Sequence, residues 1–200
     1  MEGNVLLDTD HPHLDLYPGL AEWWRQAERT WEKHRTSERL TLARQINFRN
    51  KLIDQLPTSP LRLYTASGMH VSAALVEKPN LIVEHGLYWG AVSSRAEGFY
   101  LCAILNNHEL TQLVRPLMSY GKDERHIDKH VWHLPIPLYD PAKPVHQRLS
   151  TLGRQEAELV AGLDIDEQGN FVNLRQDIRE VLTASSSAEE INQIVMELLG

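Results

Sequence analysis

The chain has 200 residues, of which 42% are hydrophobic and 24% are charged, and its formal net charge at pH 7 is −7. This composition excludes a disordered chain and is enough for one hydrophobic core, or a core with a helical appendage. The single cysteine, Cys102, excludes an internal disulfide and a cysteine-based zinc site. No apolar run is long enough to span a bilayer, so we expect a soluble cytoplasmic protein that has no membrane contact.

Positive charge is concentrated in one segment. Residues 25–51 carry eight lysines and arginines against three glutamates, whereas residues 1–24 carry five acids and no base. The tail, residues 154–200, has three bases and ten acids. A phosphate-facing surface is therefore expected from residues 25–51 or from the centre of the chain, not from the tail. The alternative is that the basic residues of 25–51 lie on solvated helix faces.

The N-terminal region, residues 1–56, is predicted to be a pair of helices. The first helix begins after Pro18-Gly19, and the second follows Ser37 and runs to about Gln55. The first is indicated by an apolar stripe at helical spacing: Leu20, Trp23, Trp24, Ala27 and Trp31. We expect its three tryptophans to be largely buried, because large aromatic side chains supply much of the core of a small domain. The alternative is that they stack on nucleic-acid bases.

The central region, residues 57–142, is predicted to be a small, mainly antiparallel sheet packed on helices, which makes the fold class α+β. Short β-rich runs separated by turn residues are typical of such a sheet. The expected strands are Leu61–Thr65, His70–Val76, Leu81–Glu84 and Leu87–Val92. A helix over Ser94–Asn106 is apolar around most of its circumference and should be central. A further helix is predicted over about His108–Met118.

A polar loop, Ser119–His126, follows these helices. It contains a glycine, a tyrosine and two cationic side chains, which are the components of phosphate and base contacts on DNA. Tyr120 can stack or donate a hydrogen bond, Lys122 and Arg125 can pair with phosphate or guanine, and Gly121 permits close approach. Nearby acidic residues almost cancel the positive charge, so an ordinary charged surface loop is the alternative.

Three histidines near this loop have the spacing of a possible metal site. His126, His130 and His133 would lie on one face if the segment were helical. No HExxH motif and no companion cysteine accompanies them. Surface histidines, or histidines that face DNA, are the better explanation, so no metal site is predicted.

The C-terminal region, residues 143–200, is predicted to be helical. An extended connector, Leu134–Pro137, precedes it because its prolines cannot lie inside a helix. The first helix begins near Pro144, and its apolar seam suits packing on another helix, either within the chain or in a partner: Val145, Leu149, Leu152, Leu159 and Leu163. Two acidic helices should follow, the last one with a capping box at Ser187-x-x-Glu190.

Four segments carry a resemblance to a known family. Trp23-Trp24, Tyr64–Gly68, Leu87–Trp89 and Tyr120–Pro137 occur in the order seen in the C-terminal target-recognition region of large N6-adenine DNA methyltransferases. The chain resembles the TaqI-like specificity domains of these enzymes and of type IIG restriction–modification enzymes. The resemblance implies double-stranded DNA as a ligand and a methyltransferase catalytic domain or subunit as a partner.

No catalytic residue is predicted in this chain. The [NDS]PP[YFW] motif of N6-adenine methylation is absent, and so is a glycine-rich S-adenosylmethionine loop. Catalysis and the cofactor would therefore belong to a separate domain or chain. A protein-interaction or assembly subunit without direct DNA contact is the alternative function. The residues expected to contact DNA are Tyr120, Gly121, Lys122, Arg125, His126, Lys129, Arg39, Arg44 and Lys51.

Overall fold

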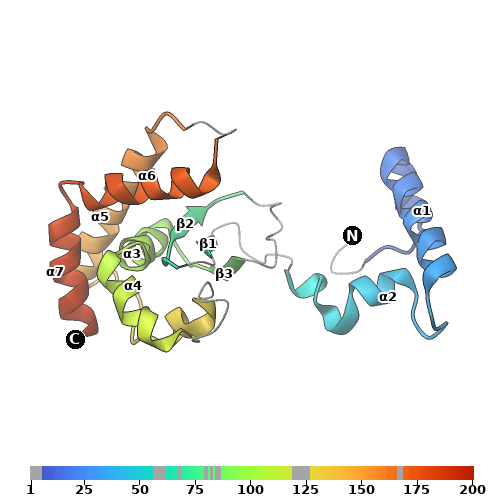
Figure 1. Cartoon of the computed structure of the whole chain (residues 1–200), viewed down its shortest axis with the longest axis horizontal. Helices are drawn as coiled ribbons and strands as arrows, with labels where there is room; N and C mark the ends of the chain where they lie inside the picture. Colours follow the sequence, from blue (N-terminus) through green and yellow to red (C-terminus); the bar gives the residue numbers. More distant parts are fainter. Residues whose placement is uncertain are drawn as a thin grey trace. The chain divides into compact units, whose positions relative to one another are not determined.

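The structure, a computed structural model, consists of two compact units, Met1–Pro57 and Thr58–Gly200 (Figure 1). It describes residues 6–55, 62–66, 69–78, 81, 83, 87–118, 127–165 and 169–200. The boundary between the units falls one residue beyond the predicted end of the N-terminal region. No helix of the described residues is long and apolar enough to cross a membrane.

The first unit is helical. A 3-10 helix, η1 (Pro12–Leu16), leads into α1 (Pro18–His34), which starts with a proline because the first helical position needs no N–H donor. A short helix, α2 (Leu42–Ile46), follows, with the Thr41 side chain as its N-cap. The small core of this unit consists of Leu14, Ala21, Trp24 and Ala43.

The predicted second helix over residues 37–55 is wrong in its extent. After α2 the chain forms only two short 3-10 segments, η2 (Phe48–Asn50) and η3 (Ile53–Gln55). Arg49 and Asn50 have positive φ values of 55° and 60°, which are incompatible with a continuous right-handed helix. The Asn47 side chain accepts a hydrogen bond from the Ile53 amide at 3.2 Å, a contact that competes with helix continuation.

The expected burial of all three tryptophans is also wrong. Trp24 is 7% exposed and its indole N–H donates to the Leu7 carbonyl at 3.2 Å, whereas Trp23 is 60% exposed. Trp31 is partly buried. The reason is that α2 is only five residues long, and so it cannot cover the whole apolar stripe of α1.

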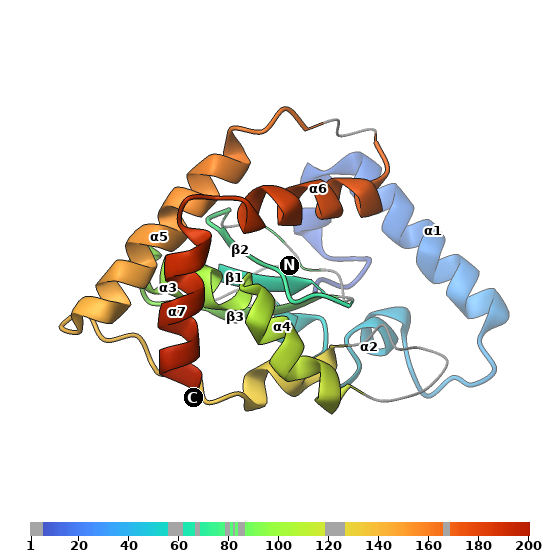
Figure 2. The same ribbon diagram turned by 60° about the vertical axis from the view of Figure 1, so that its left-hand side comes forward.

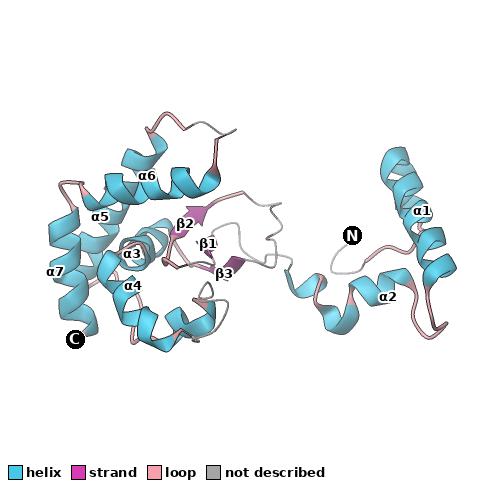
Figure 3. Cartoon of the chain, viewed as in Figure 1, coloured by secondary structure: helices cyan, strands magenta, loops and turns pink. Residues whose placement is uncertain are grey.

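The second unit contains three strands, β1 (Arg62–Ala66), β2 (Ala73–Val76) and β3 (Leu87–Ala91). They pair in the order β2-β1-β3, and β1 is antiparallel to both neighbours (Figure 3). Leu81 and Val83 lie outside any strand, unlike the expectation for residues 81–84; residues 82 and 84 are outside the described residues.

Helix α3 (Arg95–Leu105) is the centre of this unit. Ser94 caps it by accepting a hydrogen bond from the Glu97 amide at 3.1 Å, and Tyr100, Ile104 and Leu105 are fully buried. Apolar residues around most of its circumference predicted this central position. Helix α4 (His108–Val114) follows after the Asn107 cap, and a 3-10 turn, η4 (Arg115–Leu117), extends it.

An extended connector contacts α3 before the next helix begins. It follows the 3-10 helix η5 (Asp128–His133) and contains no helix, as its prolines predict. The Tyr100 hydroxyl donates to the Pro137 carbonyl at 3.0 Å, and the Asp140 amide donates to Nδ1 of His146 at 2.9 Å. Burial raises the pKa of Tyr100 to about 12, so this hydroxyl remains a donor.

Helix α5 (Pro144–Ala161) packs along α3 (Figure 2). The close approach depends on Gly153, because a Cβ at this position would lie 2.2 Å from the Phe99 carbonyl oxygen. Leu149 and Leu152 of the predicted seam are buried in the core of this unit, whereas Leu159 is exposed. The middle of the seam thus packs within the chain.

The last two helices are α6 (Phe171–Thr183) and α7 (Ala188–Leu199). Ile191 and Val195 of α7 belong to the same core as α3 and α5, so the region 143–200 is not separate from the sheet region. The predicted capping box is wrong: the Ser187 hydroxyl donates to the buried Glu156 carboxylate at 3.3 Å. The Glu190 carboxylate instead accepts two hydrogen bonds from Arg148.

Candidate nucleic-acid interface

Most of the residues expected to contact DNA lie outside the described residues. These are Tyr120, Gly121, Lys122, Arg125 and His126. Lys129 lies on η5, and its side chain is not described.

The two residues that flank this loop are fixed in one core. Met118, at its start, packs against the core of the second unit, and Ile127, at its end, is 3% exposed. Val131, one turn further along η5, is also buried in that core. The loop is therefore held at both ends by the same packed unit, an arrangement in which loops commonly carry binding residues.

The predicted secondary contacts lie on the first unit. Arg39, Arg44 and Lys51 are all exposed. None forms an ion pair with another described residue. Arg44 is two residues from both Leu42 and Ile46, so it lies on the opposite side of α2 from these apolar side chains.

A large cleft of about 1450 Å³ lies within the second unit, between β2, α3, α5, α6 and α7. Figure 2 shows α6 beside β2, across this part of the unit. Cationic and titratable side chains line one part of the wall: His70, His108, Arg175 and Arg179.

The two arginines of this wall form no ion pair with another described residue. Arg175 and Arg179 are one helical turn apart on α6 and both are partly buried. Neither forms an ion pair or a side-chain hydrogen bond with another residue in the part of the chain that the structure describes.

Several positively charged side chains surround His70. Burial is the main cause of its lowered pKa, and the positive charges of Arg179, Arg115, His108 and Arg175 lower it further. Arg115 is the first residue of η4, which ends two residues before the loop 119–126 begins. The cationic groups thus come from three separate segments of the chain.

A buried acid lies elsewhere in the same cleft. The Glu156 carboxylate accepts hydrogen bonds from the hydroxyls of Ser185 at 3.2 Å and Ser187 at 3.3 Å. Burial raises the pKa of Glu156, although the two hydroxyls oppose this effect. Burial also raises the pKa of Cys102 to about 12, so its thiol is not activated as a nucleophile.

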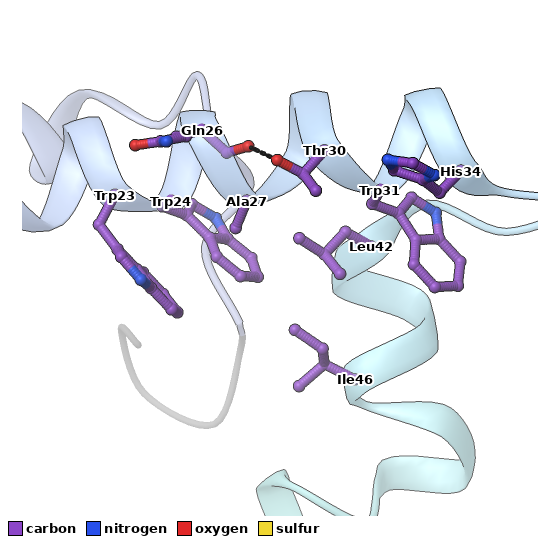
Figure 4. Close-up of a pocket in the computed structure, with 9 residues that line it drawn as sticks. All are labelled: Trp23, Trp24, Gln26, Ala27, Thr30, Trp31, His34, Leu42 and Ile46. Atoms are coloured by element: carbon purple, nitrogen blue, oxygen red, sulfur yellow. Dashed lines mark hydrogen bonds between the residues drawn. The ribbon is translucent and has the colours of Figure 1, made fainter.

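The first unit has an apolar groove of about 590 Å³ between α1 and α2. Figure 4 shows Trp23, Trp24 and Trp31 projecting from α1 toward Leu42 and Ile46 of α2. The Trp23 and Trp24 rings are nearly parallel, with centroids 5.9 Å apart. The Trp31 indole nitrogen is buried and has no hydrogen-bond partner in the described structure. This groove, defined by these five residues, exposes aromatic surface.

The described residues contain no group of three histidine, cysteine or carboxylate side chains that could hold a metal ion. The rings of His130 and His133 have centroids 6.3 Å apart, and His126 is outside the described residues.

Comparisons with family models, with curated proteins and with solved structures found no match to this chain.

The charge balance of each segment did not predict that Arg175 and Arg179 would line a cleft with His70 and His108. The tail has only three bases against ten acids. This ratio gave no reason to expect two of those bases on one wall of a cleft. The available signal was their spacing of four residues, which places both on one side of a predicted helix.

Proposed function

We propose that this chain is the DNA target-recognition part of an N6-adenine DNA methyltransferase of a restriction–modification or phage-defence system. The order of the four sequence segments described above supports the proposal. One structural observation carries the proposal: Met118 and Ile127, the residues on either side of the loop 119–126, pack in one core. Arg115, which precedes the loop, contributes to the positive surroundings of His70.

In this proposal the chain reads DNA and another domain or chain performs the methyl transfer. S-adenosylmethionine would bind to that catalytic part. The expected base-reading residues are Tyr120, Lys122 and Arg125, and the expected phosphate contacts include Arg39, Arg44 and Lys51. A protein of this kind would be cytoplasmic, where it has access to double-stranded DNA.

The proposal is tested with alanine variants in the complete methyltransferase assembly. Removal of a base-reading Arg125 should cost about 1–3 kcal/mol of binding and relax the preference at one base position. Removal of a phosphate-binding Lys51 should weaken binding to all sequences alike. Unchanged affinity and an unchanged methylation pattern for the Tyr120, Lys122 and Arg125 variants together would remove this loop from the recognition surface.

A second candidate function is that of an assembly subunit without DNA contact. The apolar groove of the first unit favours it, because Trp23 is 60% and Ile46 is 40% exposed. Exposed clusters of large apolar side chains commonly mark protein interfaces. A Trp23→Ala variant that abolishes assembly with the catalytic part, in a chain whose loop variants all retain wild-type DNA affinity, would favour this function.

A further inference from the structure

We propose that Arg175 and Arg179 of α6, together with His70 and His108 across the cleft, form a binding site for phosphate groups of the DNA backbone. These four residues define what we call the α6 cationic wall. The inference rests on the proposed function, and it adds a contact surface that is separate from the loop 119–126 and from the first unit.

Arg175 and Arg179 carry positive charges that no described side chain pairs. Both residues are partly buried, and no described carboxylate forms an ion pair with either guanidinium group. Three other arginines of the same unit do have partners: Arg148 binds Glu190, Arg95 binds Glu77 and Arg154 binds Glu158. A bound anion would supply the counter-charge on α6.

The cleft wall brings these side chains to one place. Arg175 and Arg179 lie one turn apart on one side of α6, while His70 precedes β2 and His108 begins α4. Side chains from three segments of the chain therefore line one cleft. Nε2 of His108 already lies 3.0 Å from Nε2 of Gln112, which leaves its other ring nitrogen for a ligand. Guanidinium groups bind phosphate through two parallel hydrogen bonds, and a row of such groups suits successive phosphates of a backbone.

The acidic residues of the cleft form no ion pair with the two arginines of this wall. Glu156, Glu180 and Glu189 also line the cleft. The Glu156 carboxylate is bonded to two serine hydroxyls, and the Glu180 carboxylate accepts a hydrogen bond from Gln176 at 2.9 Å. The charges that lower the pKa of His70 are positive. A phosphate beside His70 would be attracted by this potential.

Duplex DNA is the occupant that best fits the rest of the molecule. Arg115 is part of the same positive surroundings and lies four residues before the first residue of the loop expected to read bases. A backbone that passes the α6 cationic wall would thus continue toward the loop. A small phosphorylated ligand would present the same phosphate group. The experiment below distinguishes phosphate of the DNA backbone from phosphate of a small ligand.

The test compares a double variant, Arg175→Gln with Arg179→Gln, with the wild-type chain in the methyltransferase assembly. Binding to duplex DNA is measured by fluorescence anisotropy from low to moderate salt. We expect weaker binding to every sequence, and a slope of log affinity against log salt that is shallower by about 1.8, or about 0.9 for each phosphate that is no longer bound. Replacement of both arginines by lysine should retain most of the slope.

Arg154→Gln is the matched control, because it removes a positive charge from the same unit at an exposed position paired with Glu158. It should leave affinity and slope unchanged. Wild-type affinity and slope in the double glutamine variant, with its circular dichroism unchanged, would overturn the α6 site. That result would not affect the proposed function, because base preference is measured separately with the variants of the loop 119–126.

An independent readout is the imidazole signal of His70 in NMR titrations of the whole chain. Bound phosphate should raise the pKa of His70, because a nearby negative charge stabilises the imidazolium form. A rise with duplex DNA but not with millimolar inorganic phosphate, and absent from the glutamine variant, supports a DNA-backbone site.

An equal rise with inorganic phosphate alone, in a chain that binds no duplex, would overturn the DNA assignment and the proposed function, and would leave a small-phosphate site. No rise with either probe would overturn the site itself.

Discussion

At the scale of single residues, the contact between α3 and α5 depends on one glycine. In a Gly153→Ala variant the new Cβ would lie 2.2 Å from the Phe99 carbonyl oxygen, so the helices must separate. We expect a decrease of about 1–3 kcal/mol in the free energy of unfolding, which is the range for overpacked cores. Urea unfolding, followed by circular dichroism and by the amide signals of α3, measures this decrease.

Gly162→Ala is the control for that variant. A Cβ at residue 162 would make only ordinary contacts, the nearest at 3.5 Å, and its φ of −85° suits alanine. A Gly153→Ala protein as stable as Gly162→Ala would contradict the close packing of α3 and α5. The sequence predicted two apolar helices here, but the need for a glycine arises from their mutual approach and has no local signal.

Glu156 gives a prediction for pH dependence. Its pKa is raised in the folded protein by burial, so folding favours the protonated carboxyl. Stability from this group is fully present below the unfolded pKa and is lost as pH rises through the folded pKa. A Glu156→Gln variant stays neutral and can still accept hydrogen bonds from Ser185 and Ser187. Its stability relative to the wild type should therefore increase as pH rises from about 4 to 8.

Unfolding in urea across this pH range measures the difference between the two proteins. A difference that is constant, or that falls with rising pH, would contradict the burial of a carboxyl with a raised pKa. The sequence had indicated a capping box at Ser187, because Ser-x-x-Glu is a local pattern. The Ser187 hydroxyl instead binds Glu156, which is 31 residues away, and a local pattern cannot reveal such a contact.

At the scale of elements, Asn106 joins α3 to the edge of the sheet. Its amide side chain accepts from the Ala73 N–H at 2.8 Å and donates to the Ala73 carbonyl at 2.9 Å. An Asn106→Ala variant would leave both backbone groups of β2 without these partners. We expect a decrease of about 1–3 kcal/mol in the free energy of unfolding and faster hydrogen exchange at Ala73.

The control for this variant is Asn173→Ala, since Asn173 is exposed on α6 and makes no side-chain hydrogen bond with another described residue. It should leave the free energy of unfolding within about 0.5 kcal/mol of the wild type. Equal stability of the two variants would contradict the role of Asn106 in holding β2.

Helices with a long apolar pattern were predictable from the sequence. The helix predicted over 94–106 is present as α3 (Arg95–Leu105). Its apolar residues and its Ser94 cap both favour a helix that begins at residue 95. The prediction for the segment 37–55 failed because Arg49 and Asn50 adopt positive φ values that no apolar spacing reveals. The exposure of Trp23 has the same structural cause, because a second helix that continued past Ile46 would have covered more of α1.

At the scale of the whole molecule, the sequence shows how charge is distributed along the chain but not which charged side chains share a surface. The acidic tail was expected to carry no phosphate-facing surface. In the structure its Arg175 and Arg179 share a cleft wall with His70 and His108, which lie far before them along the chain. Only the fold brings these groups together, so residue counts along the chain cannot locate them.

The most direct test of DNA recognition is the salt dependence of binding by the complete assembly to duplexes that differ at single base pairs. We predict measurable affinity at low salt that falls linearly with log salt, by a slope of about 0.9 per phosphate contacted. We also predict a preference of about 1–3 kcal/mol at a specified base pair that disappears in the Arg125→Ala variant. Affinity that is absent at low salt, or that is equal for all duplexes and unaffected by Arg125→Ala, would contradict the assignment of target recognition to this chain.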